Sequence, residues 1–151
     1  MRNYCMLCFF SLTALIGCAE LIRVDAETYM LNPGMYEGQY ILITTNLEEV
    51  SEHYQLLQGL DIEIAAPLTH FEERDAASWY VTLEKGGNTI RAYEDNYQRF
   101  VPSEADYLAR WAKHEGGTVT AQGKLMEWGM ELDQLTYRGL IVNTNVSSSA
   151  A

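Results

Sequence analysis

The stretch Trp79-Tyr-Val-Thr-Leu-Glu-Lys-Gly-Gly-Asn-Thr-Ile-Arg-Ala-Tyr-Glu94 predicts a β-hairpin. Its two halves, Trp79–Glu84 and Thr89–Glu94, alternate apolar and polar side chains, as strands with one buried face do. Between them stands Gly86-Gly87, a pair typical of tight hairpin turns because both central residues of such turns take a positive φ. This hairpin is the local unit from which the rest of the fold is predicted.

The two strands of the hairpin present faces of different chemistry. The apolar face, which we expect to fill a core, consists of Trp79, Val81, Leu83, Ile90 and Ala92. The opposite face is the candidate ligand-binding face, and it carries Tyr80, Thr82, Arg91 and Tyr93. Phenol rings and a guanidinium can stack on a planar group of a ligand, and Arg91 is the one cation expected on this face. The alternative is that both tyrosines pack beneath the long stretch Glu48–Ser78.

Three further segments predict strands, namely Gly38–Thr45, Thr118–Met126 and Leu135–Asn143. Gly123, within the second of these, would permit a bulge or a bend of a barrel. The last two are joined by the predicted loop Glu127–Gln134, whose side chains Trp128 and Met130 are apolar. They would serve either as contact anchors for a partner or as a cap on the end of a barrel.

Two helices are predicted. One follows Pro102 with the capping-box-like start Ser103-Glu-Ala-Asp106 and ends at Gly116-Gly117. The other covers Leu47–Gln58, where Asn46 is placed to accept a backbone N–H at the helix start. For this second segment an alternative stays open, in which a long first strand continues through Val50.

The order of these elements resembles that of the OB-fold, a mainly β, five-stranded Greek-key barrel with a helix between strands 3 and 4, here with a second helix after strand 1. The chain is similar to the anticodon-binding-domain-like OB modules found on some bacterial lipoproteins. The segments that carry the resemblance are Gly38-Gln-Tyr-Ile-Leu-Ile-Thr, Trp79-Tyr-Val-Thr-Leu-Glu, Thr89-Ile-Arg-Ala-Tyr, Gly117-Thr-Val-Thr-Ala-Gln-Gly-Lys-Leu and Tyr137-Arg-Gly-Leu-Ile-Val. The resemblance implies a ligand face on strands 2 and 3. The chain departs from the pattern in the length of Glu48–Ser78, which is expected to form a long loop between strands 1 and 2, with His70–Asp75 as a polar loop of mixed charge.

The N-terminus predicts a secretory signal. Arg2 is followed by the apolar run Cys5–Ile16, which is shorter than the roughly 20 residues that a membrane-spanning helix needs. The run ends in Leu15-Ile16-Gly17-Cys18, which resembles the lipobox of bacterial lipoproteins. The resemblance implies cleavage before Cys18 and lipidation of Cys18, including a fatty acyl chain such as palmitate. The alternatives are an ordinary signal peptide cleaved nearby and a short uncleaved anchor.

In a Gram-negative lipoprotein, Ala19 directly after the lipidated Cys18 implies sorting to the outer membrane, facing the periplasm. The expected organisation is therefore a signal peptide over 1–17, a lipidated lead segment over 18–34, an OB-fold domain over 35–142 and a flexible tail over 143–151.

The composition limits the chemistry of the chain. It holds 151 residues with 10 Lys and Arg against 21 Asp and Glu, a net charge of −11, which disfavours nucleic acid as a partner. Cys5 and Cys8 would leave with the signal, and Cys18 would carry lipid, so no thiol would remain for a disulfide or a metal. Glu49 and His53 share a helical face but lack a third ligand, so no metal site is predicted.

The sequence also lacks the Gly-x-Ser-x-Gly and Ser-x-x-Lys motifs and a Gly-rich phosphate loop, so we expect no catalytic residues and no cofactor. It therefore predicts a lipid-anchored binding module of the cell envelope with a protein partner from the envelope. The alternative is an inhibitor or immunity lipoprotein that covers a basic toxin or hydrolase, since acidic charge would speed that encounter.

Overall fold

The structure is a computed structural model that describes residues 20–75, 78–94, 110 and 117–143. The predicted signal peptide and Cys18 lie outside the described residues. So does the helix predicted to begin at Ser103, except for Arg110, which is helical. Within the described residues, the helices are too short or too polar to cross a membrane.

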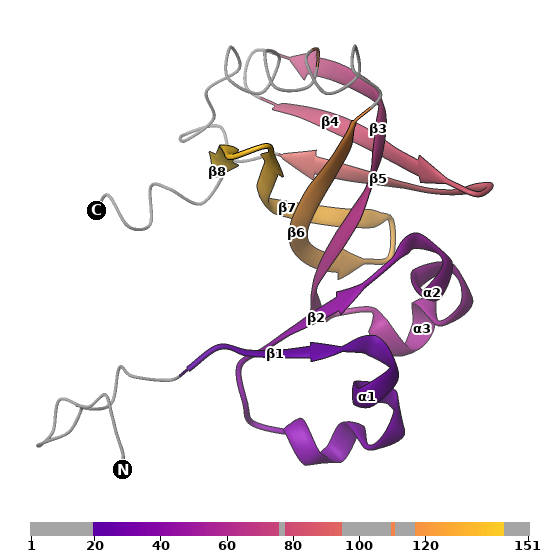
Figure 1. The fold of residues 1–151 in the computed structure, drawn as a ribbon, viewed down its shortest axis with the longest axis vertical. Helices are drawn as coiled ribbons and strands as arrows, with labels where there is room; N and C mark the ends of the chain where they lie inside the picture. Colours follow the sequence, from indigo (N-terminus) through magenta and orange to yellow (C-terminus); the bar gives the residue numbers. More distant parts are fainter. Residues whose placement is uncertain (1–19, 76–77, 95–109, 111–116, 144–151) are drawn as a thin grey trace, which may run out of the picture.

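Five strands close into a barrel (Figure 1). They are β3 (Asp61–Asp75), β4 (Ser78–Lys85), β5 (Asn88–Glu94), β6 (Thr118–Met126) and β7 (Gly129–Tyr137). The pairing order is β3-β4-β5-β7-β6, and β6 pairs back with β3. All these pairs are antiparallel except β5 with β7, which are parallel. This closed order is that of the OB-fold barrel, so the predicted fold class is confirmed.

Together with one strand that follows the barrel, an N-terminal extension of two strands widens the sheet to eight strands. The extension consists of β1 (Ile22–Asp25), α1 (Ala26–Leu31), the 3-10 helix η2 (Pro33–Tyr36), β2 (Ile41–Thr45), α2 (Leu47–Glu52) and α3 (Tyr54–Leu57). β1, β2 and the first part of β3 run parallel, which requires crossover connections, and the short helices supply them. Residues 20–34, expected to belong to a lead segment, thus contribute β1, α1 and the start of η2.

The first barrel strand is not the predicted one. Gly38–Thr45 contains β2, which lies outside the barrel, whereas the first barrel strand is β3, inside the stretch Glu48–Ser78 that was predicted to be a loop. The inward side chains of β3 are the buried residues Ile62, Ile64, Ala66 and Leu68. A register shift between Leu68 and His70 lets this long strand bend, so that its first half pairs with β6 and its second half with β4.

The last barrel strand is also displaced from the prediction. β7 occupies most of the predicted loop Glu127–Gln134, and Met130 is fully buried in the core instead of anchoring a partner. β8 (Leu140–Asn143) pairs with β7 after a hairpin turn at Arg138-Gly139, where both φ angles are positive. The single predicted strand Leu135–Asn143 is therefore the end of β7, a turn and β8.

The predicted hairpin and the helix after Asn46 are confirmed. Gly86 and Gly87 take φ angles of 60° and 87° between β4 and β5. The Asn46 side chain accepts a hydrogen bond of 2.9 Å from the backbone N–H of Glu49. The helical segment divides at His53 into α2 and α3, and it precedes the barrel.

One hydrophobic core joins the extension to the barrel. The predicted apolar face of the hairpin points into it, since its side chains are fully buried except for Ile90, which is 7% exposed. Val24 and Ile43 of the extension belong to the same cluster of buried side chains. The barrel also contains the predicted irregularity at Gly123, where the register between β6 and β7 shifts.

Candidate functional site

The outer face of β3, β4 and β5 brings the predicted ligand-binding residues together. In the sheet register, Tyr80 stands opposite Tyr93, and Thr82 stands opposite Arg91. Because these residues alternate with the buried ones, all four lie on one side of the sheet, as the sequence pattern predicts.

Three aromatic rings contact one another in a row on this side. The ring centroids of Tyr80 and Tyr93 are 5.1 Å apart, and those of Tyr93 and Trp128 are 5.3 Å apart in an edge-on arrangement. Trp128 comes from the turn between β6 and β7, and its side chain is 51% exposed. We call Tyr80, Tyr93 and Trp128, with the arginines Arg74 and Arg91 that contact them, the aromatic face.

Both arginines lie over tyrosine rings. The guanidinium carbon of Arg91 is 4.7 Å from the centroid of Tyr80, and its Nη1 donates a hydrogen bond of 3.4 Å to the Tyr93 hydroxyl. The guanidinium carbon of Arg74 is 5.3 Å from the centroid of Tyr93. Such cation–π contacts hold each guanidinium plane in place. Arg91 and the ring of Tyr93 both pack against Tyr80, which is therefore only 8% exposed although it lies on the outer face.

A carboxylate lies at one edge of the aromatic face. Glu72 Oε1 accepts a hydrogen bond of 3.1 Å from the Tyr80 hydroxyl and lies 3.0 Å from Nε2 of His70. These bonds, that of His70 first, lower the pKa of the Glu72 carboxyl below its usual range. The pKa of the Tyr80 phenol is raised, first by desolvation and then by its bond to Glu72. The Tyr80 hydroxyl is therefore held as a proton donor.

Sequence reasoning missed His70, Glu72 and Arg74, because they lie in the stretch that was interpreted as a polar loop. A signal for them was present, since these three polar residues alternate along the chain and Phe71, between the first two, packs on Trp79 at a centroid distance of 5.8 Å. Arg91 is therefore not the one cation of this face, because Arg74 lies on it too.

The other candidate sites do not assemble. Glu49 accepts a hydrogen bond from the Thr45 hydroxyl, and His53 lies 3.7 Å from Glu52. Over residues 20–75, 78–94, 110 and 117–143, no group of three potential metal ligands comes together. A surface cavity of about 360 Å³ beside the β4–β5 turn is lined mainly by polar side chains, with one carboxylate, Glu48, and one ammonium, Lys85.

Comparison with models of protein families and with curated proteins gives no match. Among solved structures, an OBody, AM1L10, bound to hen egg-white lysozyme aligns with a TM-score of 0.45 at 14% identity, over 62% of this chain and 90% of that one. A putative aspartyl-tRNA synthetase from Leishmania major aligns with a TM-score of 0.38 at 12% identity, over 59% of this chain and 19% of that one. The yeast Stn1 and Ten1 structure gives a TM-score of 0.37 at 10% identity, over 88% and 68%. The OB-fold is assigned to this chain from its own order of paired strands.

Proposed function

We propose that this chain is a lipid-anchored binding module of the bacterial cell envelope that holds a protein partner on its aromatic face and catalyses no reaction. The observation that supports the proposal is the composition of that face. Tyrosine, tryptophan and arginine, the residue types that dominate the binding energy of protein interfaces, are gathered there in mutual contact.

The contacts within the face favour tight binding. Rings and guanidiniums that already support one another lose less conformational freedom when a partner docks, and this lowers the entropic cost of association. The exposed side of Trp128 offers apolar area, and the outer edge of Arg91 offers N–H donors. A segment with an apolar or aromatic side chain next to a carboxylate would match both.

Nucleic acid is a weaker match to the same face. Nonspecific binding of a nucleic acid depends on several phosphate contacts by Lys and Arg, whereas the aromatic face holds two arginines with Glu72 beside them. The chain as a whole carries 21 acidic residues against 10 basic ones, which repels polyphosphate.

The lipid anchor and the envelope location belong to the same proposal. They are supported by the lipobox-like Leu15-Ile16-Gly17-Cys18, and Ala19 favours the outer membrane facing the periplasm. The thioether lipid and the acylated amino terminus implied by a lipobox would provide more than one acyl chain, as stable anchoring requires.

A capture experiment tests the proposal. Tagged full-length chain is expressed in a bacterial host, crosslinked in the intact envelope and purified, and captured proteins are identified by mass spectrometry. We expect a partner that is retained by Leu56→Ala, a control at an exposed apolar position on α3, and lost by Trp128→Ala and Arg91→Ala. With the purified partner, each loss should reach at least about 30-fold in Kd, which corresponds to the roughly 2 kcal/mol that defines a hot spot.

Two results would overturn the proposal. One is equal capture by the control and by both variants of the aromatic face. The other is micromolar binding of a fluorescent single-stranded oligonucleotide at about 0.15 M salt, weakened in the double variant Tyr80→Ala/Tyr93→Ala. The second result would make nucleic acid the ligand of this face.

A further inference from the structure

Exposed apolar side chains are concentrated near the start of the described chain. Seven large hydrophobic residues are exposed among the described residues, and four of them fall between positions 21 and 40. These four are Leu21, Leu31, Met35 and Tyr40, with exposed fractions of 41%, 82%, 60% and 56%. We call them the N-terminal apolar surface.

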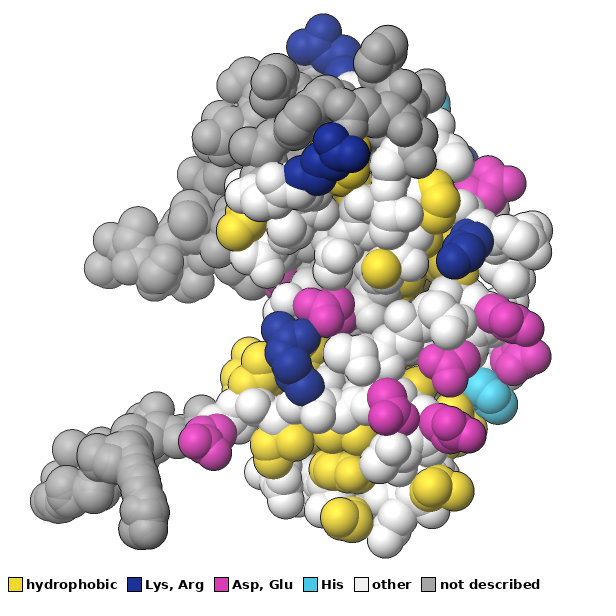
Figure 2. All heavy atoms as spheres, viewed as in Figure 1, with side chains coloured by type: hydrophobic (Ala, Val, Ile, Leu, Met, Phe, Trp, Pro, Cys, Tyr) yellow, Lys and Arg dark blue, Asp and Glu magenta, His cyan; other side chains and the backbone are white. Residues whose placement is uncertain are grey.

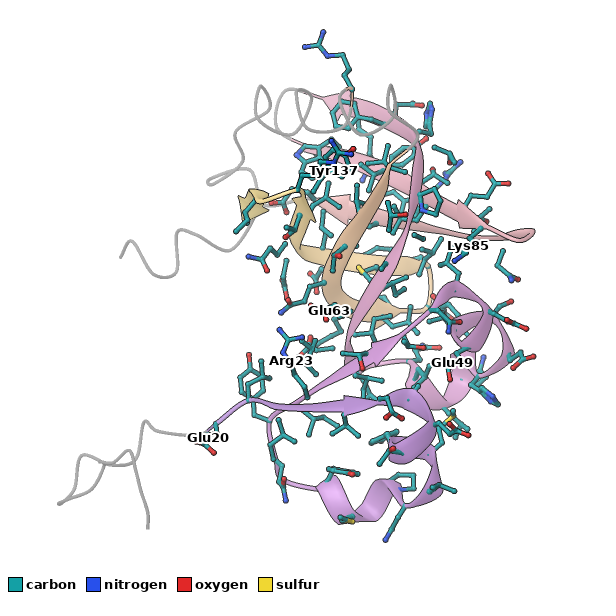
Figure 3. All side chains as sticks on the ribbon, viewed as in Figure 1. Glu20, Arg23, Glu49, Glu63, Lys85 and Tyr137 are labelled. Atoms are coloured by element: carbon teal, nitrogen blue, oxygen red, sulfur yellow. The ribbon has the colours of Figure 1, made fainter. Side chains whose placement is uncertain are left out.

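The fold places these residues at one end of the molecule. The backbone N–H of Ile22 donates to the carbonyl of Tyr40, so Leu21 and Tyr40 lie side by side where β1 and β2 begin. Leu31 ends α1 and Met35 lies in η2, the elements that lead the chain back from β1 to the start of β2. Figure 2 shows hydrophobic side chains over this lower end of the molecule, and Figure 3 shows Glu20 at the same end.

We infer that the N-terminal apolar surface lies against the lipid bilayer when Cys18 is lipidated, an inference that rests on the proposed anchor. Glu20 follows Cys18 by two residues and Ile22 follows it by four. At no more than about 3.6 Å per residue, Glu20 lies within about 7 Å of the lipidated residue and β1 begins within about 14 Å. So short a connection holds the folded domain at the membrane, and the face around Glu20 is the one that meets it.

The chemistry of this surface fits an interfacial contact that is apolar and not electrostatic. Leucine and methionine side chains gain by entering the acyl boundary, and tyrosine is favoured at the level of the headgroups. Residues 20–40 contain four acids and one base, Arg23, which is paired with Glu63 at 2.8 Å. No cationic cluster in this segment therefore attracts anionic headgroups. The contact should persist at high salt.

This placement leaves the aromatic face free for a partner. β3 pairs with β2 through Ile62 and carries Glu72 of the aromatic face ten residues later. At about 3.3 Å per residue, that path along the strand reaches up to about 30 Å away from the N-terminal extension. In Figure 1, the second half of β3 and β4 lie at the opposite end of the molecule from α1. The module would therefore present its binding face away from the bilayer.

Fluorescent labels on the lipidated full chain test the inference. The three cysteines are Cys5, Cys8 and Cys18, so a cysteine added elsewhere would be the one free thiol after processing. Leu31→Cys and Met35→Cys report on the N-terminal apolar surface, and Leu56→Cys and Ile141→Cys are controls at exposed apolar positions outside it. Each variant is labelled with an environment-sensitive dye and reconstituted into phosphatidylcholine–phosphatidylethanolamine vesicles containing spin-labelled lipid.

We expect the dyes at positions 31 and 35 to shift to shorter wavelength and to be quenched severalfold more than the control dyes, with no change at high salt. Vesicle flotation and the mass of the N-terminal peptide report the anchor separately. If the lipidated protein floats while all four dyes stay in water, the membrane contact is wrong and the anchor stands. If Cys18 carries no lipid and the protein does not float, the anchor is wrong, and the inference with it.

Discussion

Gly123 is the position where the barrel is expected to tolerate a methyl group least. A Cβ atom placed on it would lie 2.1 Å from the carbonyl oxygen of Glu131 and 2.9 Å from the carbonyl carbon of the same residue. Both atoms belong to the backbone of β7, which is paired with β6 on each side of the register shift. No rotation of a side chain relieves such a contact, so Gly123→Ala must push two paired strands apart.

The cost of Gly123→Ala follows from three effects. Forcing extra volume into a packed structure costs about 1–3 kcal/mol, and weakening a ladder hydrogen bond costs about 0.5–1.5 kcal/mol. The third effect has the opposite sign, because alanine restricts the unfolded chain more than glycine does and thereby stabilises the folded protein by about 0.4–1 kcal/mol. We therefore expect the free energy of unfolding to fall by about 0.5–4 kcal/mol, with no change in the denaturant dependence.

Urea unfolding followed by tryptophan fluorescence measures this loss, and Gly34→Ala is the matched control. Gly34 lies in η2 at a φ that is not positive, and the nearest atom to its added Cβ is Asn32 Oδ1 at 3.9 Å. The control should keep its stability or gain about 0.4–1 kcal/mol. Equal urea midpoints for the two variants would mean that β6 and β7 do not approach one another closely at Gly123, which would contradict the pairing of these strands in the barrel.

Three further outcomes are expected. Asn46→Ala removes the side-chain acceptor at the start of α2 and should cost about 0.5–2 kcal/mol in the same urea assay, most of which Asn46→Ser should restore. The pKa of Glu72 is lowered in the folded state, so its stabilising effect is present above the ordinary carboxyl pKa of 4.5 and is lost as pH falls through the lowered value. The stability difference between the parent and Glu72→Gln should therefore shrink on acidification, and a constant difference would contradict the assigned hydrogen bonds. Cys18→Ala should abolish incorporation of an alkynyl fatty acid, and equal labelling of the parent and the variant would remove the lipid anchor.

The hairpin could be predicted from the sequence because its determinants are local. Alternation of side chains along Trp79–Glu84 and Thr89–Glu94 assigns the buried face, and Gly86-Gly87 supplies the two positive φ angles of the turn. Asn46 likewise marks the start of a helix through a bond that spans three residues.

β3 could not be recognised in the same way. Pro67 interrupts its pattern, and the stretch from His70 to Asp75 is mostly charged or polar, which is typical of a loop. What makes it a strand is nonlocal, since β2, β4 and β6 all pair with it. With β3 assigned to a loop, β2 took its place as the first barrel strand, and the parallel extension was not predicted.

The candidate site likewise combines residues that local sequence pattern predicts with residues that depend on nonlocal strand pairing. Alternation placed Tyr80, Thr82, Arg91 and Tyr93 on one face, because that inference needs the local hairpin alone. The residues contributed by β3 depend on the pairing of a strand that was not recognised. Trp128 was predicted to lie in a turn, and it does, but its contact with Tyr93 arises because β5 and β7 run side by side in the barrel.

The placement of charge separates the two functions considered for this chain. The aromatic face contains two arginines, each over a tyrosine ring, and one carboxylate, Glu72, at its edge, so that it offers a strongly basic partner more like charge than opposite charge. The acids of α2, Glu48, Glu49 and Glu52, lie outside this face, on the helix between β2 and β3. An inhibitor of a basic toxin would use acidic surface of that kind, and Trp128 and the tyrosines would then lie outside its interface. Because Trp128 is exposed and two arginines lie on the aromatic face, we propose that the partner of the chain presents apolar and acidic groups to that face. A partner with apolar and acidic groups would favour the binding module, whereas a strongly basic partner would favour the inhibitor.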